Sequence, residues 1–357
     1  MPPVPANAPP GYPAQPLQRM SHSGPIGAPI AAPTPSFWPS RLAAAAVAGG
    51  LLAVVQAKVA RPMLLAERFL PGAGWIELAL LAAYAGWLAG KMQDARASAT
   101  WRRRVWLLFS VVFFGQLLLG LAGFERLLMT GKLHLPIPAL IVAGPLYRGE
   151  GFFMPTLFLT TLLLVGPAWC SHLCYIGSWD LVASRKQRRP QLLPRWRGPA
   201  RAGILALVAA AALGLRLLGA GPGVALVAGA AFGLAGVAVM LLFSTRTGAM
   251  VHCTVFCPIG LLATTIGKLS PFRMRIAPGC SRCNACSRAC RYDALRPEHI
   301  AKSRPGLSCT LCGDCVGACH SRSIEYRFLG LPARRARAVF IVLVAALHAV
   351  FLGVARI

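Results

Sequence analysis

The sequence predicts a mainly α-helical bundle that crosses a membrane about six or seven times and carries one small inserted α+β domain. The chain is 56% apolar and only 13% charged, with a mean hydropathy of +0.59, whereas a soluble globular protein carries about 25% charged residues. Several apolar runs approach the roughly 20 residues that a helix needs to cross a bilayer. Eight cysteines gathered between residues 280 and 319, before the last of these runs, indicate the inserted domain.

The chain is also strongly basic, with a formal net charge of +27. Such an excess indicates either a nucleic-acid partner or a membrane protein, which concentrates Lys and Arg in its cytoplasmic loops. Because no motif of a nucleic-acid-binding module accompanies the charge, we expect membrane lipid, and no nucleic acid, as a partner.

The N-terminal segment, residues 1–40, is rich in proline and alanine and nearly uncharged. It cannot bury a core, so we expect a disordered tail. It lacks the basic start and apolar stretch of a secretory signal. The composition predicts these further domains: a transmembrane bundle over 41–243, a membrane-edge segment over 244–271, a cysteine-rich domain over 272–330 and a final transmembrane helix over 338–354.

The candidate spans are apolar runs of suitable length. Gln56 and Lys58 interrupt the first run and Glu77 interrupts the second, so a six-span version without the first remains open. The runs are 42–59, 75–90, 105–124, 152–169, 202–220, 223–243 and 338–354.

The orientation follows from the distribution of Lys and Arg. The segment 91–104 contains five of them, 170–201 contains seven and 244–337 contains fifteen. The rule that positive loops stay inside places these segments in the cytoplasm, although long segments obey it loosely. With seven spans, the N-terminus then lies inside and the C-terminus outside.

Two cysteine bursts share the spacing C-x2-C-x2-C-x3-C. Three thiolates on a tight loop can reach three irons of one cubane, and the fourth projects toward a second cluster. The alternative is structural zinc, but four-cysteine zinc sites usually come as two C-x2–4-C pairs. We therefore assign one 4Fe-4S cluster to Cys280, Cys283, Cys286 and Cys319, and a second to Cys309, Cys312, Cys315 and Cys290.

The flanks of the bursts match as well. The stretches "FRMRIA" before the first burst and "SIEYRF" after the second alternate as strands do. They can pair and close a small α+β unit. The stretches "RYDAL" and "HSRSI" follow the fourth cysteines at equivalent places, which indicates an internal duplication.

The remaining cysteines form two C-x3-C-x-I-G motifs. Cys170 and Cys174 follow the fourth span, and Cys253 and Cys257 follow the sixth. In a helix, a spacing of four puts both sulfurs on one face, and two such pairs together would present four thiolates. These pairs could bind a metal, cycle through a disulfide, or merely pack.

Two histidines lie beside these thiols. Imidazole is a ligand for iron, copper and zinc, so His172 and His252 are candidate ligands, although an interfacial histidine with no such role is the more frequent case. The segment 125–151 contains Glu125, Arg126, His134 and Glu150. These side chains could hold a quinone headgroup, or the segment could simply anchor at the interface.

The bursts resemble the bacterial two-cluster ferredoxins over residues 272 to 328. That family has proline after each fourth cysteine, where this chain has Arg291 and His320. The substitution removes no ligand.

The tandem bursts, preceded by two membrane-edge C-x3-C motifs, resemble the NapH-type, NosR-type and MauN-type polytopic membrane iron–sulfur proteins. The resemblance covers about residues 75 to 335. Tyr175 stands where proline is expected in the first motif, whereas Pro258 keeps the second.

This resemblance implies a multi-pass protein of the prokaryotic inner membrane, with its ferredoxin domain in the cytoplasm. It implies that electrons move between the quinone pool and a respiratory or periplasmic redox partner, through two 4Fe-4S clusters and with a quinone or further metal as additional candidates. A role as quinol dehydrogenase component would make the protein an enzyme, which the sequence leaves open.

The alternative is a maturation factor that reduces a metal or thiol on a client protein through the C-x3-C pairs. A transporter is disfavoured because the spans have few charged residues away from their ends.

Overall fold

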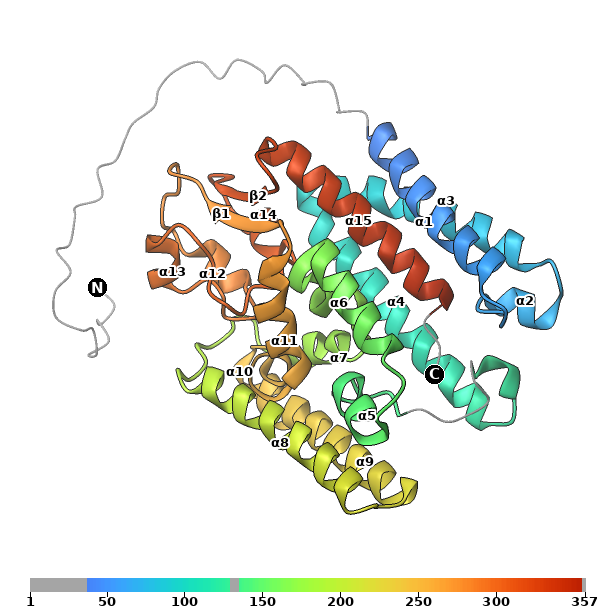
Figure 1. Ribbon diagram of the computed structural model, residues 1–357. Helices are drawn as coiled ribbons and strands as arrows, with labels where there is room; N and C mark the ends of the chain where they lie inside the picture. Colours follow the sequence, from blue (N-terminus) through green and yellow to red (C-terminus); the bar gives the residue numbers. More distant parts are fainter. Residues whose placement is uncertain (1–36, 129–134, 355–357) are drawn as a thin grey trace, which may run out of the picture. The chain divides into compact units, whose positions relative to one another are not determined.

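The computed structural model describes residues 37–128 and 135–354 (Figure 1). Most of the expected tail, and His134, lie outside these residues. Helix α1 (Trp38–Lys58) begins inside the range expected for the tail, because Pro39 occupies its first turn, where the fixed φ of proline suits a helix.

The described chain is mainly helical, with one small two-stranded sheet. Six helical stretches are long and apolar enough to cross a membrane, and each overlaps a run expected from the sequence. They are Trp38–Lys58, Ala95–Leu121, Phe153–Leu173, Arg197–Leu217, Pro222–Thr247 and Ala333–Val354.

The expected span 75–90 forms helix α3 (Gly74–Gln93), which is not among the six. Its two ends are charged, by Glu77 in the first turn and Lys91 in the last, and these residues lower its mean hydropathy. Glu77 accepts a hydrogen bond from the backbone N–H of Ala66 (2.7 Å). Its carboxylate therefore pairs with the first turn of α2 and does not lie in the membrane interior.

The long elements are α1, α3, α4 (Ala95–Leu121), α6 (Phe153–Val165), α8 (Arg197–Leu217), α9 (Pro222–Val239) and α15 (Ala333–Val354). Shorter helical elements connect them: α2 (Leu65–Phe69), η1 (Glu125–Leu127), α5 (Leu140–Arg148), η2 (Gly166–Ala168), η3 (Trp169–Leu173), α7 (Gly177–Ser184), η4 (Met240–Ser244), α10 (Thr245–Thr247), η5 (His252–Phe256), α11 (Pro258–Ile266) and η6 (Gly267–Leu269).

Helix α15 is the most buried of the candidate spans. In its most apolar stretch 67% of residues are buried, against 11% in α8. Its N-terminal part also carries the cysteine-rich domain, because Phe340 packs against Phe272 and Tyr326. Helix α8 therefore offers its surface to lipid, whereas α15 joins the bundle to the inserted domain.

The inserted domain closes on strands β1 (Arg273–Ile276) and β2 (Ile324–Arg327), which pair antiparallel as the flanking stretches predict. Met274 opposite Tyr326 and Ile276 opposite Ile324 form the buried face, as the period of two requires. The rest of the domain consists of α12 (Ala285–Ala289), α13 (Pro297–Ala301) and α14 (Asp314–Ala318), grouped near the strands in Figure 1.

Contacts gather the three segments that are richest in Lys and Arg. Arg102, near the start of α4, donates to the backbone carbonyl of Ser171 (3.0 Å) and to both carboxylate oxygens of Asp314 (3.0 and 2.9 Å). Arg337, near the start of α15, donates to the carbonyl of Gln93 (2.6 Å). These helix ends therefore meet.

The connections at the other helix ends meet one another too. Tyr147 donates from its hydroxyl to the carbonyl of Ala220 (2.7 Å), and Arg68 donates to the carbonyl of Arg126 (3.2 Å). The connection before α3 thus contacts one group of connections, through Arg68, and the end of α3 contacts the other, through Gln93. Helix α3 therefore runs from one group of connections to the other, as its neighbours do.

Candidate metal centres

Both cysteine bursts adopt the same unusual backbone. The residues on either side of the second cysteine have positive φ in each burst: Arg282 (52°) and Asn284 (57°) in the first, Leu311 (55°) and Gly313 (80°) in the second. Non-glycine residues seldom adopt this region. Left-handed residues of this kind turn successive N–H groups toward one point, which forms the concave anion sites found around many iron–sulfur clusters.

The fourth cysteines also have matching surroundings. Asp293 and Arg322, three residues after them, both have positive φ (50° and 53°). The next N–H in each repeat donates to the fourth cysteine's Sγ, from Ala294 to Cys290 and from Ser323 to Cys319, both at 3.3 Å. The internal duplication seen in the sequence is thus present in the backbone.

The fold brings the thiols of different bursts together. Cys286 interacts electrostatically with Cys319 and Cys280. Cys315 interacts with Cys290, Cys309 and Cys312. Cys319 therefore lies near Cys286 of the first burst, and Cys290 lies near Cys315 of the second. The complete crossed ligand sets stay a prediction from the spacing. We call these groups the outer set (Cys280, Cys283, Cys286, Cys319) and the inner set (Cys290, Cys309, Cys312, Cys315).

The two sets differ in exposure. In the outer set Cys283 is exposed to solvent, whereas Cys290 and Cys315 of the inner set are buried. Burial raises the pKa of Cys290 to about 12. A buried thiol of this kind becomes a thiolate only when a cation compensates its charge.

The inner set is attached to the helical bundle. Asp314, next to Cys315, is the residue that Arg102 holds through two hydrogen bonds. Ser171 donates from its hydroxyl to the carbonyl of Thr310 (2.9 Å), between the first two cysteines of the second burst.

Arg291 and Asp293 join the domain to the bundle on another side. Arg291 donates to the carbonyls of Ser184 (3.1 Å) and Gly248 (2.7 Å). Asp293 accepts from the guanidinium of Arg197 in α8 and from the backbone N–H of Leu193 (3.1 Å). Arginine thus takes the place of the ferredoxin proline because its side chain anchors the domain to two loops.

The two C-x3-C motifs share one local structure. Each ends a turn closed by an i→i+5 hydrogen bond, from the N–H of Cys174 to the carbonyl of Trp169 (3.0 Å) and from Cys257 to His252 (2.7 Å). The expected α-helical turn is therefore replaced by a π turn, a feature frequent at functional sites. Tyr175 in place of proline leaves the backbone alike: φ and ψ are −80° and 115° at Cys174, and −72° and 117° at Cys257.

The second thiol of each motif receives two backbone hydrogen bonds. Cys174 accepts from the N–H groups of Ile176 and Gly177, and Cys257 accepts from Ile259 and Gly260. Helices α7 and α11 begin there, so their N-terminal dipoles also favour negative charge on these sulfurs.

The two motifs meet. Cys253 interacts electrostatically with Cys257, Cys174 and Cys170. Burial raises the pKa of Cys174 to about 12 and also raises the pKa of Cys257. We call these four thiols the membrane-edge set. In the described part of the chain, no three His, Cys, Asp or Glu side chains have the spacing required to hold one metal ion.

Two charged residues that sequence reasoning missed face the membrane-edge set. Arg201 of α8 is buried (4% exposed), and it interacts with Cys257, Cys170 and Cys253. Its Nε has no hydrogen-bond partner among the described residues. An unpaired guanidinium is costly to bury, so its place beside these thiols fits a centre of negative charge.

Asp180 of α7 is the second. It accepts from the N–H of Cys253 (2.9 Å) and from the hydroxyl of Ser244 (2.6 Å). It thus orients the π turn that carries Cys253. The sequence did contain a signal for Asp180. The chain has only 10 acidic residues, so an acidic side chain near the end of a span is a candidate functional residue.

The neighbouring histidines contact other groups. His172 packs against Phe340, and its Nδ1 lies 3.2 Å from the carbonyl of Ala168. His252 packs on Phe256. Neither contact directs a ring nitrogen at the membrane-edge thiols. Glu125, Arg126 and Glu150, the candidate quinone contacts that the structure describes, are all exposed.

A family model described as a 4Fe-4S binding domain matches residues 149–190 and 229–277. The chain contains a 4Fe-4S binding domain. The matched segments include both C-x3-C motifs and end before the first burst. No curated protein and no solved structure matches the chain.

Proposed function

We propose that this is an integral-membrane electron-transfer protein with three iron–sulfur centres, held by the outer, inner and membrane-edge sets. The observation that carries the proposal is that thiols from separate chain segments approach one another in three places: Cys286 and Cys319, Cys315 and Cys290, and Cys253 with Cys170 and Cys174. The outer and inner sets hold two 4Fe-4S clusters, as their ferredoxin spacing and left-handed backbone support. The family match supports a cluster at the membrane-edge set.

The residues suggest an order of electron transfer. Cys283 of the outer set is exposed and available to a soluble partner. The inner set lies deeper, and Tyr292 interacts electrostatically with its Cys312 and with Cys253 and Cys170 of the membrane-edge set. Tyr292 is buried and thus excludes water from the space between these two sets. Bound clusters would supply one-electron chemistry in the sequence outer, inner, membrane-edge, or its reverse.

The proposal also includes the side of the membrane on which the cysteine-rich domain lies and the redox partners of the protein. The Lys- and Arg-rich helix connections meet around the cysteine-rich domain, which supports a cytoplasmic domain under the positive-inside rule. The resemblance to the NapH-type and NosR-type proteins supports a link between the quinone pool and a respiratory redox partner in the inner membrane.

The second candidate is a maturation factor that works through the C-x3-C pairs. Thiol–disulfide exchange requires a thiolate to reach the client's disulfide, yet Cys170, Cys174 and Cys257 are buried. Burial therefore favours electron transfer through a bound centre over direct exchange with a client thiol.

The test is anaerobic purification of the full chain, with iron and sulfide counting and electron paramagnetic resonance of the reduced protein. Three cubanes would give about twelve irons per chain. Cys283→Ser, Cys312→Ser and Cys257→Ser should each remove one signal and about a third of the iron. Ser287→Ala, inside the first burst, is the matched control and should keep all of it.

Two results would contradict the proposal. A preparation that holds zinc and no iron would exclude electron transfer. Unchanged iron and spectra in Cys257→Ser would remove the third centre and leave two clusters.

A further inference from the structure

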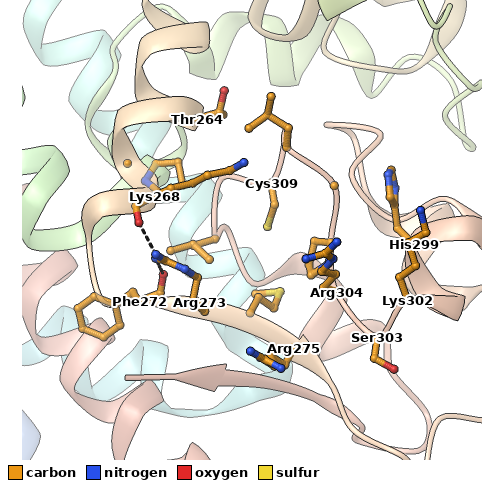
Figure 2. A pocket seen from close by; sticks show the side chains of 17 residues that line it. Thr264, Lys268, Phe272, Arg273, Arg275, His299, Lys302, Ser303, Arg304 and Cys309 are labelled. Carbon is orange, nitrogen blue, oxygen red and sulfur yellow. Dashed lines mark hydrogen bonds between the residues drawn. The ribbon is translucent and has the colours of Figure 1, made fainter. Parts of the chain in front are cut away.

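A cavity of about 1080 Å³ opens beside the inner set. Its walls come from the end of α11 and η6, from β1, and from α13 with the loop that follows it (Figure 2). It exceeds the upper end of the usual range for small-molecule sites, about 300–1,000 Å³.

Its lining is cationic. Lys268, Arg275, Lys302 and Arg304 contribute side chains, together with His299, and the lining includes no Asp or Glu. Figure 2 shows His299, Lys302 and Arg304 on one side and Lys268 on the other. The cations thus belong to separate chain segments and surround one space.

Most of this charge has no partner within the protein. Arg273 is engaged, since it donates to the carbonyls of Phe272 and Lys268. The side chains of the other cations, Lys268, Arg275, Lys302 and Arg304, make no hydrogen bond and no ion pair within residues 37–128 and 135–354. Unpaired cations on a concave surface attract an anion.

The cavity adjoins the inner set, because Met274 in its wall lies 3.4 Å from the Sγ of Cys315. Cys309 lines it, but Cys290, Cys312 and Cys315 do not. Leu307, which is 43% exposed, gives the cavity an accessible apolar wall. A bare inorganic ion would leave most of this wall uncovered, whereas an organic anion would cover it.

We propose that this cavity binds the phosphate group of an organic phosphate, with Lys302 and Arg304 as its main contacts and the apolar part of the ligand against Leu307. Arginine and lysine are the side chains that recognise phosphate through charge-assisted hydrogen bonds. The site stands independently of the cluster assignment. If Cys309 ligates the inner cluster, the ligand lies directly beside that centre.

Such a phosphate has two sources. It belongs either to a soluble organic phosphate or to the headgroup of an anionic phospholipid, since Thr264 and Lys268 come from the short apolar segment Pro258–Leu269. The chemistry of recognition is the same, and the test distinguishes the sources.

The test uses the full-length protein in phosphatidylcholine nanodiscs and equilibrium dialysis with two probes. Flavin mononucleotide and riboflavin share one ring system and differ by the phosphate. We expect flavin mononucleotide to bind at least about tenfold more tightly. The double variant Lys302→Gln/Arg304→Gln should remove this difference. Arg334→Gln/Arg335→Gln makes the same charge change at exposed positions outside the cavity and should retain it.

Repeating the titration in nanodiscs with phosphatidylglycerol identifies the source. If phosphatidylglycerol weakens the binding of flavin mononucleotide to the wild-type protein but not to the Lys302→Gln/Arg304→Gln variant, the natural ligand is a lipid headgroup. If phosphatidylglycerol leaves the binding unchanged, the natural ligand is soluble. Equal binding of the two probes by the wild-type protein, or equal losses in both double variants, would overturn the site. Iron counted in the same samples tests the proposed function separately.

Discussion

Three buried arginines, Arg102, Arg201 and Arg296, show at the residue scale that the basic excess is not confined to loops. Arg102 pairs with Asp314 and Arg296 with Asp293. Arg201 faces thiols instead of a carboxylate. Since a buried cation requires a compensating anion, these contacts mark the places where the bundle and the cysteine-rich domain depend on each other.

Replacing Arg102 tests this dependence. Arg102→Gln leaves Asp314 without its partner and removes the donor to Ser171, so we expect a loss of about 3–5 kcal/mol in the free energy of unfolding. Arg327→Gln breaks a more exposed pair, with Glu325, and should cost less than about 1 kcal/mol. Thermal unfolding of the two purified variants provides the comparison. Equal shifts would show that burial of the Arg102 pair is unimportant.

The two bursts provide a second matched pair at this scale. In Gly313→Ala, φ would remain near +80° and the new Cβ would lie 2.7 Å from the hydroxyl of Tyr326. Since a strained residue of this kind costs about 1–3 kcal/mol, the inner set should lose its iron. Asn284, at the equivalent place in the first burst, already carries a Cβ, so Asn284→Ala should retain iron at both sets. Iron counts measure both effects, and full iron in Gly313→Ala would contradict this account.

At the scale of elements, the repeats differ in what covers them. Helices α12 and α14 have equivalent places, but α14 packs against α4 and the outer end of α12 faces solvent near Cys283. The inner set therefore gains protection from the bundle that the outer set lacks.

This difference predicts the order in which the clusters are lost. Cys312→Ser keeps only the outer of the two ferredoxin-type clusters, and Cys283→Ser keeps only the inner one. On exposure to a ferrous chelator in air, Cys312→Ser should release the iron of its remaining ferredoxin-type cluster several-fold faster, because oxidant and chelator reach an exposed thiolate more readily. Time courses of iron release measure the ratio. Equal rates would show that both clusters are equally accessible.

At the scale of the whole molecule, the hydrogen bonds between helix connections divide these connections into two groups, one at each end of the bundle. The connection after α8 belongs to one group, through Ala220, and the cysteine-rich domain belongs to the other, through Asp314. Two features thus agree: the places where Lys and Arg concentrate, and the connections that touch each other.

Site-directed labelling tests the membrane sides. Leu218→Cys and Ser303→Cys each add a thiol at an exposed position in one of the two groups. A membrane-impermeant maleimide added to intact spheroplasts should label Leu218→Cys above the wild-type background and leave Ser303→Cys at background. Inside-out vesicles should reverse the result. Labelling of both variants from one side would show that the assignment of sides is wrong.

The sequence predicted the features that depend on composition and local spacing. Apolar runs located the six candidate spans, since the bilayer sets their length whatever their neighbours. Of the expected spans only α3, with Glu77 and Lys91, is less apolar than a membrane-crossing helix. The strand pair was readable from alternation. The π turns at Cys174 and Cys257 were not, since an i→i+5 turn and an α-helical turn share one sequence pattern at this length.

By itself, then, the sequence determined a helical membrane protein, the spacing within each cysteine group and the duplication of the bursts, because these are properties of adjacent residues. Only the tertiary structure decided that the two C-x3-C motifs meet, that Arg201 and Asp180 face them, and that four unpaired cations surround a cavity beside Cys309. Each of these joins segments far apart in the chain, and their approach depends on how the helices pack.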